Sequence, residues 1–383
     1  MKQAILTLFQ DCIATFLAIL KNRSILLTMV LSIGFYGIFY PTAYHAEHAQ
    51  ALPLIIVDEE QSALSHTIIR TTSHSPNVEV IDITNNLPQA LKQVRSMHAE
   101  GILYLPKTLS QSIHHGETGG IGLYLSGAYL LRTQTVSTGL ISSLEQVLID
   151  EMAKFTQISH LQLPTLVHKQ PLFNTTSGYG SYVFPAIAPL IVHQTLLLGV
   201  GMLICGFQQT HRRLRISQLI SVYLVAGLIG TLSSWYLYGF VFWQQDYPRG
   251  GNFWGMVLAT PIFVGAVIAI ASALSSFFDR SERVGQLLIF SSVPLFLLSG
   301  LAYPFVGMPK WLVNFAELLP STQGIQMFVQ LNQMGVPTQL IAPKLFYLFA
   351  VMLIMSLLAL WRLCLKPSLK PNDQQATIPT NFR

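Results

Sequence analysis

Few residues of this chain have the types and spacing that a reactive site requires. The sequence contains no G-x-x-x-x-G-K-[ST] loop for nucleotide phosphates, no G-x-S-x-G and no H-E-x-x-H. The pairs His45 and His48, and His114 and His115, lack a Cys or a carboxylate at ligand spacing, so we interpret them as solvated surface. We therefore expect no catalytic, metal or cofactor site in this chain, and no enzymatic activity of its own.

Polar residues within the apolar segments are the next candidates. His193 and Gln194 stand in "LIVHQTLLLG", and an ionisable side chain inside a membrane segment can line a substrate or proton pathway. The more ordinary role of such a pair is a hydrogen bond between neighbouring helices. The apolar segments hold no acidic pair, which disfavours a carrier driven by an ion gradient. His193 and Gln194 are thus the only pathway candidates that the sequence offers.

Six apolar segments dominate the chain. Charged residues make up 10% of the 383 residues, and the mean hydropathy is +0.48, whereas a soluble domain carries about 25% charge. A helix needs about 20 mainly apolar residues to span a bilayer. The sequence therefore predicts an α-helical membrane protein with six transmembrane helices, at roughly 24–41, 182–206, 217–243, 253–278, 284–303 and 343–364.

Basic residues orient these helices. Lys and Arg gather in the loops on one side of the predicted membrane, and that side is cytoplasmic by the positive-inside rule. Both termini are then cytoplasmic, and the net charge of +5 is a signal of topology that gives no indication of nucleic-acid binding. The residues concerned are Lys2, Lys21, Arg23, Arg212, Arg213, Arg215, Arg280, Arg283, Arg362, Lys366, Lys370 and Arg383.

Residues 42–181 form one external block of a different character. The block holds 7 Lys and Arg against 11 Asp and Glu, so it is net acidic while the remainder is basic. None of the three cysteines lies in it, so packing alone must hold it together. Strand-like and helical patterns alternate, which predicts an α/β domain inserted between helices 1 and 2. The expected strands are 52–58, 77–84, 101–106, 121–126 and 165–173, and the expected helices are 61–72, 87–98 and 129–155.

A broken apolar stretch, "LLSGLAYPFVGMPKWLVNFAELLPST", follows the fifth predicted helix at residues 297–322. Gly300 and Pro304 interrupt the helix, and a second apolar segment runs from Pro309 until Pro320 stops it. Eleven residues at about 1.5 Å each cover roughly half of the hydrocarbon thickness. The sequence therefore predicts a short external helix that does not span, followed by a second short helical pattern up to residue 335.

This short helix is amphipathic, with Lys310, Asn314 and Glu317 on one face and its apolar residues on the other. It is either an interfacial anchor, with its tryptophan at headgroup level, or an outer gate that dips into the membrane. The candidate residues for this role are Pro304, Pro309, Trp311, Phe315 and Pro320. Residues 1–23 show a similar amphipathic pattern, and we expect a helix along the cytoplasmic surface.

The order and spacing of several stretches resemble the membrane subunit of an ABC-2-type exporter, in the subgroup with a large periplasmic domain. The stretches are "LPLIIVDEEQSALSHTIIR", "HQTLLLGVGMLICG", "LLSGLAYPFVGMPKWL" and "LLPSTQGIQMFVQLNQMG". The resemblance covers nearly the whole chain. It implies a permease in the bacterial inner membrane, working as a homo- or heterodimer of permease subunits, with ATP bound by a separate ATPase. Membrane lipid is a further partner, and the subgroup allows a periplasmic adaptor protein.

On this resemblance the domains follow in chain order. They are a cytoplasmic interfacial helix (1–23), transmembrane helix 1 (24–41), a periplasmic α/β domain (42–181), a five-helix transmembrane domain (182–365) with an external amphipathic helix pair at 309–335, and a cytoplasmic tail (366–383).

Contact with an ATPase must pass through the cytoplasmic loops, which are "THRRLR" (210–215) and "DRSERV" (279–284). The second loop mixes both charge signs, which suits ion pairs at an interface. The first is purely basic, lacks the acidic–basic segment of many ABC-2 permeases, and is explained equally well by topology. The candidate coupling residues are Arg212, Arg213, Arg215, Asp279, Arg280, Glu282 and Arg283.

Two other classes have the same topology. One is an ATPase-independent membrane protein of the secretion or phage-receptor kind. The other is a sensor for a periplasmic ligand, but the chain after Trp361 is only 22 mostly polar residues, too short for an output domain.

Overall fold

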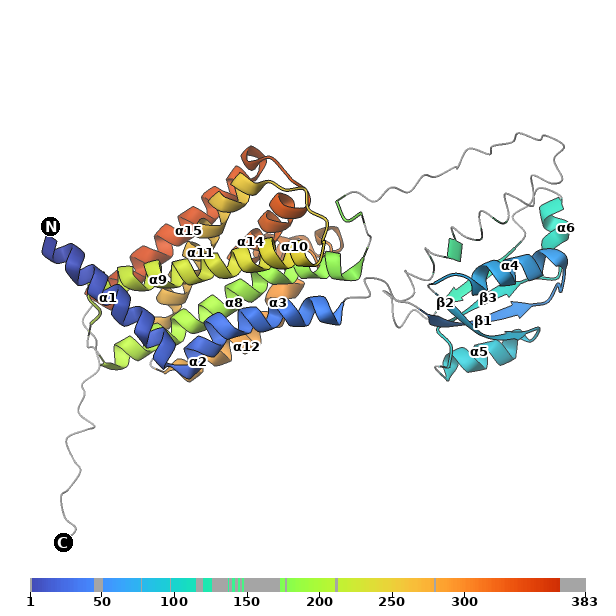
Figure 1. Cartoon of the computed structure of the whole chain (residues 1–383), viewed down its shortest axis with the longest axis horizontal. Helices are drawn as coiled ribbons and strands as arrows, with labels where there is room; N and C mark the ends of the chain where they lie inside the picture. The colour runs from blue at the N-terminus through green and yellow to red at the C-terminus, as the bar shows by residue number, and fades with distance from the viewer. Residues whose placement is uncertain are drawn as a thin grey trace, which may run out of the picture. The chain divides into compact units, whose positions relative to one another are not determined.

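The computed structural model describes residues 2–44, 51–76, 78–96, 98–114, 120–125, 137, 140, 141, 144, 147, 173–175, 178–210, 213–278 and 280–365. The chain divides into two compact units (Figure 1). Residues 46–170 form the first, which we call the sheet unit. Residues 1–45 and 171–383 form the second, the helical unit. The expected tail, 366–383, lies outside the described residues.

The sheet unit holds four strands in the order β2-β1-β3-β4. β1 pairs in parallel with β2 and β3, and β3 pairs antiparallel with β4. Four of the predicted strands are confirmed, and the fifth, at 165–173, lies outside the described residues apart from Phe173. The elements are β1 (Leu52–Asp58), α4 (Ala63–Ser73), β2 (Val78–Thr84), α5 (Leu87–Arg95), β3 (Gly101–Leu105), α6 (Leu109–His114) and β4 (Gly122–Leu125).

Helices cover both faces of this sheet, with α4 on one side and α5 on the other (Figure 1). β1 is therefore buried on both faces, which explains its continuous run of apolar residues. Leu54 and Ile56 pack with Ile68 of α4, while Ile55 packs with Ala90 of α5. Of the helix expected at 129–155, the described residues 137, 140, 141, 144 and 147 are helical, and Leu140 and Leu144 join the α4-side core.

In its described residues, the helical unit contains six helices that are long and apolar enough to cross a membrane. They are Lys2–Lys21, Arg23–Ala43, Tyr179–Thr210, Ile216–Gln244, Phe253–Ser275 and Thr338–Leu365. The elements within them are α1 (Lys2–Lys21), α2 (Arg23–Leu26), a π segment (Leu27–Leu31), α3 (Ser32–Ala43), α8 (Tyr179–Thr210), α9 (Ile216–Trp235), a π segment (Tyr236–Val241), α10 (Phe242–Gln244), α11 (Phe253–Ser275), α15 (Ala342–Leu360) and a final π segment (Trp361–Leu365).

This set of six differs from the predicted set at two places. The span predicted at 284–303 is a helix of only 17 residues, α12 (Ser281–Leu297). It ends early because Pro294 lies inside it and Gly300 takes a left-handed backbone with φ of 80°. The sixth candidate is instead α1, which was expected to lie along the surface and whose length and composition also suit a span.

The core of the helical unit is centred on α11 and α8. Both helices are buried over most of their length, and α11 packs against α8, α9 and α15. Two short helices after α12, α13 (Lys310–Glu317) and α14 (Pro320–Phe328), complete the unit together with a π segment at Val329–Gln333. We call α13 and α14 the helix pair. Its bounds confirm the two short helices predicted within 309–335.

Candidate functional site

Two regions of the helical unit contain the charged and broken segments that the sequence singled out. One is formed by the described residues of two loops, 210, 213–215, 276–278 and 280–284, with the π segment at Trp361–Leu365, and we call it the basic end. The other is the helix pair. α8 joins the two, since its first residues hydrogen-bond next to the helix pair and its last residues enter the basic end. Each region is built from segments far apart in the sequence.

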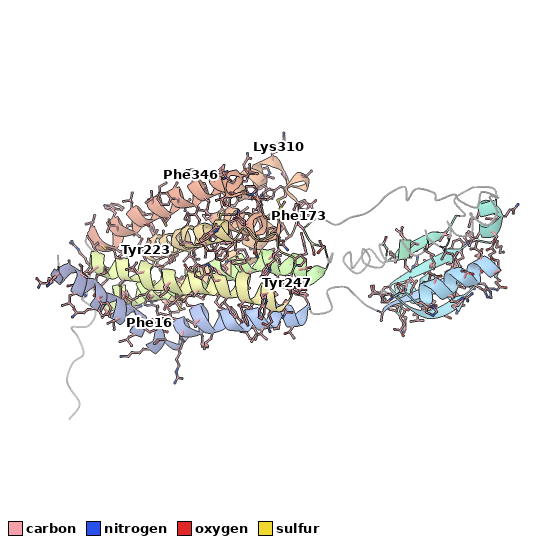
Figure 2. The ribbon with its side chains drawn as sticks, turned by 45° about the horizontal axis from the view of Figure 1, so that its top comes forward. Phe16, Phe173, Tyr223, Tyr247, Lys310 and Phe346 are labelled. Carbon is pink, nitrogen blue, oxygen red and sulfur yellow. The ribbon has the colours of Figure 1, made fainter. Side chains whose placement is uncertain are left out.

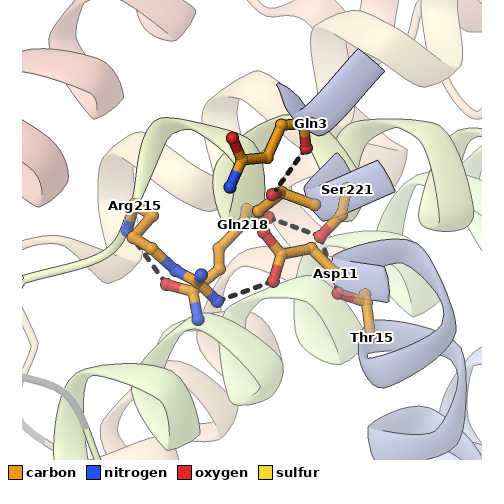
Figure 3. A network of polar contacts seen from close by, with 7 residues as sticks. Gln3, Asp11, Thr15, Arg215, Gln218 and Ser221 are labelled. Carbon is orange, nitrogen blue, oxygen red and sulfur yellow. Dashed lines mark hydrogen bonds and ion pairs between the residues drawn. The ribbon is translucent and has the colours of Figure 1, made fainter. Parts of the chain in front are cut away.

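Arg215 of the basic end forms an ion pair with a residue of the same chain (Figure 3). Its guanidinium donates to the Asp11 carboxylate of α1 at 2.7 Å. Asp11 is buried although Arg215 is largely exposed. One turn further on, the hydroxyls of Thr15 and Ser221 lie 2.7 Å apart. The polar face of α1 is therefore held against the start of α9. The sequence did not reveal this contact, because 204 residues separate Asp11 and Arg215.

The opposite face of α1 is apolar and uncovered. Ile5, Phe9 and Phe16 are between 47% and 63% exposed, whereas Asp11, Thr15 and Ile19 are buried. A helix that turns polar residues inward and apolar residues outward is suited to a lipid environment. The amphipathic pattern predicted for residues 1–23 is thus confirmed.

The final helix segment joins the two loops of the basic end. The Arg362 guanidinium donates to the hydroxyl and the backbone carbonyl of Ser276, at 3.0 and 3.2 Å. It also lies 3.8 Å over the ring of Phe277. From the other loop, the Leu214 backbone N–H donates to the Leu363 carbonyl at 3.2 Å. The sequence marked Arg362 only as a topology signal; its role as the link between the loops depends on tertiary contacts.

The remaining coupling candidates point to the surface. Arg213, Arg280, Glu282 and Arg283 are exposed, and none of them forms an ion pair with another residue of the described ranges. Val284, next to them, is buried and anchors the loop against the core. Arg212 and Asp279 lie outside the described residues. The basic end therefore presents charges of both signs that are available to a partner.

The two members of the helix pair have different surroundings. On α13, Trp311 is 71% exposed and Phe315 is 51% exposed, while Ala316 is buried. Lys310 points away from the unit (Figure 2). On α14, Ile325 and Phe328 are at most 1% exposed. The structure thus places α13 on the surface and builds α14 into the unit.

Hydrogen bonds from α14 and from the π segment that follows it (Val329–Gln333) reach the ends of α8, α12 and α15. The Gln326 side chain donates to the Ser299 carbonyl after α12 at 3.2 Å, and accepts from the Lys344 ammonium of α15 at 3.0 Å. Gln333 donates to the Ser181 carbonyl of α8 at 2.7 Å. α14 is therefore placed so that its movement would loosen α8, α12 and α15 together.

Aromatic rings continue these contacts into the core. Phe328 of α14 stacks on Tyr238 with ring centroids 4.7 Å apart, and meets the edge of Phe263 at 5.2 Å. Phe263 in turn lies 6.4 Å from the ring of His193. Phe328 thus joins α14 to α11 and, through Phe263, to the centre of α8. Sequence reasoning missed Phe328 and Gln326, because neither residue type is unusual in an amphipathic pattern.

The profile of the ABC-2 family transporter protein matches residues 23–361, which is most of the chain. The chain belongs to the ABC-2 transporter family. It is therefore a membrane permease component of a transporter, and this permease is not itself an enzyme. A search of the curated proteins found no match. α1 lies wholly before the matched residues, so its ion pair with Arg215, the residue before α9, is a feature that the family match does not explain.

His193 and Gln194 lie in the interior of this permease. The Nδ1 atom of His193 and both side-chain polar atoms of Gln194 are buried and have no hydrogen-bond partner among the described residues. The expected helix–helix hydrogen bond is therefore wrong for these atoms. Leaving buried polar atoms unpaired costs stability, of the order of 1–3 kcal/mol for each group. The pair stays a candidate for the pathway.

Proposed function

We propose that this ABC-2 permease is the membrane subunit of an ATP-driven exporter in a bacterial inner membrane. A separate ATPase would bind the basic end on the cytoplasmic side, and two permease subunits, identical or related, would form the substrate pathway. The sheet unit would then be periplasmic. The chain itself would bind no nucleotide.

The basic end is the observation that carries this proposal. It offers exposed charges of both signs, which is the pattern that gives electrostatic complementarity at a protein interface. Arg362 and Leu214 join its two loops to the end of α15. A displacement of either loop would therefore be transmitted to α15, which packs along α11 in the core. Arg215 would contribute less charge to this contact surface than the other arginines, because it is already paired with Asp11.

At the other end of α8, we propose that α14 is the moving part of the outer gate. α13 would be the part of this gate that lies at the membrane interface. Lipid would surround the exposed apolar face of α13. The buried polar pair of α8, His193 and Gln194, would meet substrate once α14 moves, because Phe263 connects the two. The unpaired polar atoms of these two side chains would then find hydrogen-bond partners on the substrate, and only during transport.

The test is to isolate the tagged permease from its own membranes in mild detergent and to identify an ABC-type ATPase among the retained proteins. Arg280→Glu with Glu282→Arg should reduce the retained ATPase at least several-fold, because both exposed charges would then oppose their partners. The matched control is Lys310→Glu with Glu317→Lys, which makes the same reversal on α13.

Two results would decide against the proposal. The first is that no ABC-type ATPase is retained by the unaltered permease. The second is that reversal at the basic end leaves both ATPase retention and transport at the control level. Either would favour the ATPase-independent class of membrane protein with the same topology.

A further inference from the structure

The sheet unit contains a cavity of about 810 Å³ beside the carboxyl ends of two parallel strands. Its described lining residues come from the ends of β1 and β2 and from one face of α4. Small ligands bind in clefts of this size. The described lining residues are Asp58, Gln61, His66, Ile69, Arg70, Ile83, Thr84 and Asn85.

A bulge in β2 brings an apolar side chain into this cavity. The register of β1 with β2 shifts between Leu54 and Ile55, so that Leu54 faces Val80 but Ile56 faces Ile83. An extra residue in one strand reverses the side-chain alternation beyond it. Ile83 is thereby turned to the α4 side of the sheet, where it lines the cavity with Ile69 and remains 53% exposed. Bulges often re-aim side chains next to binding sites.

Two basic side chains lie on the α4 side of the same cavity. His66 and Arg70 are four residues apart on α4 and therefore share one face of the helix. Both are exposed, and neither side chain forms a hydrogen bond or an ion pair with another residue in the described part of the chain. The cavity thus offers a guanidinium and an imidazole that form no ion pair within the described residues.

The neighbouring carboxylates are engaged elsewhere. Asp58, which also lines the cavity, accepts from the backbone N–H groups of Glu60 and Gln61 and from the Ser65 hydroxyl, at 2.8–3.1 Å. Glu59 accepts from the Tyr104 hydroxyl, and Glu60 accepts from the Ser110 backbone N–H. Three hydrogen bonds hold the Asp58 carboxylate in place, and it forms no ion pair with Arg70 in the described part of the chain.

We propose that this cavity binds a small organic carboxylate with an apolar body. The carboxylate lies against the Arg70 guanidinium, whose planar fork matches a carboxylate in two parallel hydrogen bonds. His66 and the Gln61 and Asn85 amides complete the polar side, and the apolar body covers Ile69 and Ile83. This inference does not depend on the proposed ATPase coupling, because it concerns binding by the sheet unit alone.

The test uses 3-phenylpropionate as probe and 3-phenylpropanamide as its neutral counterpart, with the full chain in nanodiscs and titration calorimetry as readout. The acid should bind at least tenfold more tightly than the amide, since the charge-assisted pair is lost in the amide. Arg70→Gln should weaken binding of the acid at least tenfold and leave that of the amide unchanged. Arg95→Gln, at an exposed arginine of α5, is the matched control and should have no effect.

A second variant separates the apolar contact from the charge. Ile83→Ser should weaken binding of 3-phenylpropionate but not of acetate, which has no apolar body to lose. Equal binding of acid and amide would overturn the proposal, as would equal binding by the Arg70→Gln and Arg95→Gln proteins with both folded by circular dichroism. Inorganic phosphate competing as well as the organic acid would overturn the ligand class.

Discussion

α13 and α14 are consecutive short helices, separated by two residues, yet their surroundings differ completely. α13 buries only Ala316, whereas α14 buries two thirds of its residues. α13 exposes a tryptophan and a phenylalanine; α14 places its phenylalanine between Tyr238 and Phe263. The comparison shows that a proline break separates a surface element from a structural one within a few residues.

The boundary between the two helices depends on side chains of α15 and of α14 itself. The Tyr347 hydroxyl of α15 donates to the Leu318 carbonyl at 2.5 Å, and Gln323 donates to the Glu317 carbonyl at 2.7 Å. Both bonds satisfy carbonyls at the end of α13, which has no further helical turn to do so. Pro320 is then the first residue of α14. At this position a backbone N–H would have no acceptor within the helix, so the N–H that proline lacks is not missed. The turn is thus held in place while α13 itself remains uncovered.

The largest expected effect comes from adding a methyl group to α14. In Gly324→Ala the new Cβ would lie 2.2 Å from Cε2 of Phe263, a fully buried ring that cannot move aside. Overpacking of this kind costs about 1–3 kcal/mol or more. We expect a clear fall in the thermal midpoint of the detergent-solubilised protein, measured by size-exclusion fluorescence.

Gly206→Ala is the control for this change. Gly206 lies in α8, and a Cβ there meets no atom within 4 Å. Alanine favours helix over glycine, so this variant should be neutral or slightly stabilising. A fall of equal size in both variants would show that α14 is not specially packed.

An intermediate effect is expected from Gln326→Ala. The change removes the acceptor of the half-buried Lys344 and the donor to the Ser299 carbonyl. Because Lys344 is only half-buried and water can reach it, losing its acceptor costs about 1–2 kcal/mol. Gln323→Ala removes one exposed hydrogen bond to α13 and should cost clearly less, about 0.5–1.5 kcal/mol. The order of the two thermal midpoints is the measurement, and the reverse order would mean that α14 is anchored mainly through α13.

The smallest effect on stability is expected from Trp311→Ala. Trp311 is 71% exposed within the unit, and surface substitutions usually stay within about 0.5 kcal/mol. Transport should nevertheless fall more than the folded yield does. The reason is that α13, the interfacial part of the proposed gate, loses its aromatic anchor at the membrane interface. Unchanged transport per folded molecule would remove α13 from the gate and leave it as an anchor only.

The sequence predicted the existence of both short helices but not their difference. Pro309 marks the start of the first helix and Pro320 its end, and the alternation of Lys310 and Glu317 with apolar residues indicates an amphipathic surface helix. On α14, Gln323 and Gln326 indicate an equally polar helix. The burial of α14 depends on its contacts with Phe263, Lys344 and Ser299. These residues are too far from α14 in the sequence for a local pattern to predict the contacts.

The same limit applied elsewhere in the molecule. β1 could be predicted from its continuous apolar run, and α4 from its helical spacing, because both signals are local. The Asp11–Arg215 ion pair and the Arg362 link could not, because each joins segments separated by 86 residues or more. The bulge that turns Ile83 toward α4 also depends on pairing with β1.

The central claim is that α14, and not α13, is built into the permease. The direct test is the rate at which an impermeant maleimide modifies single cysteines, introduced after Cys12, Cys205 and Cys364 are replaced. Lys310→Cys and Glu317→Cys should react quickly from outside, since both positions are exposed. Ser321→Cys should be protected in the folded protein and react only after denaturation, since Ser321 is 1% exposed. Modification of Ser321→Cys as fast as Glu317→Cys in the folded protein would contradict the account.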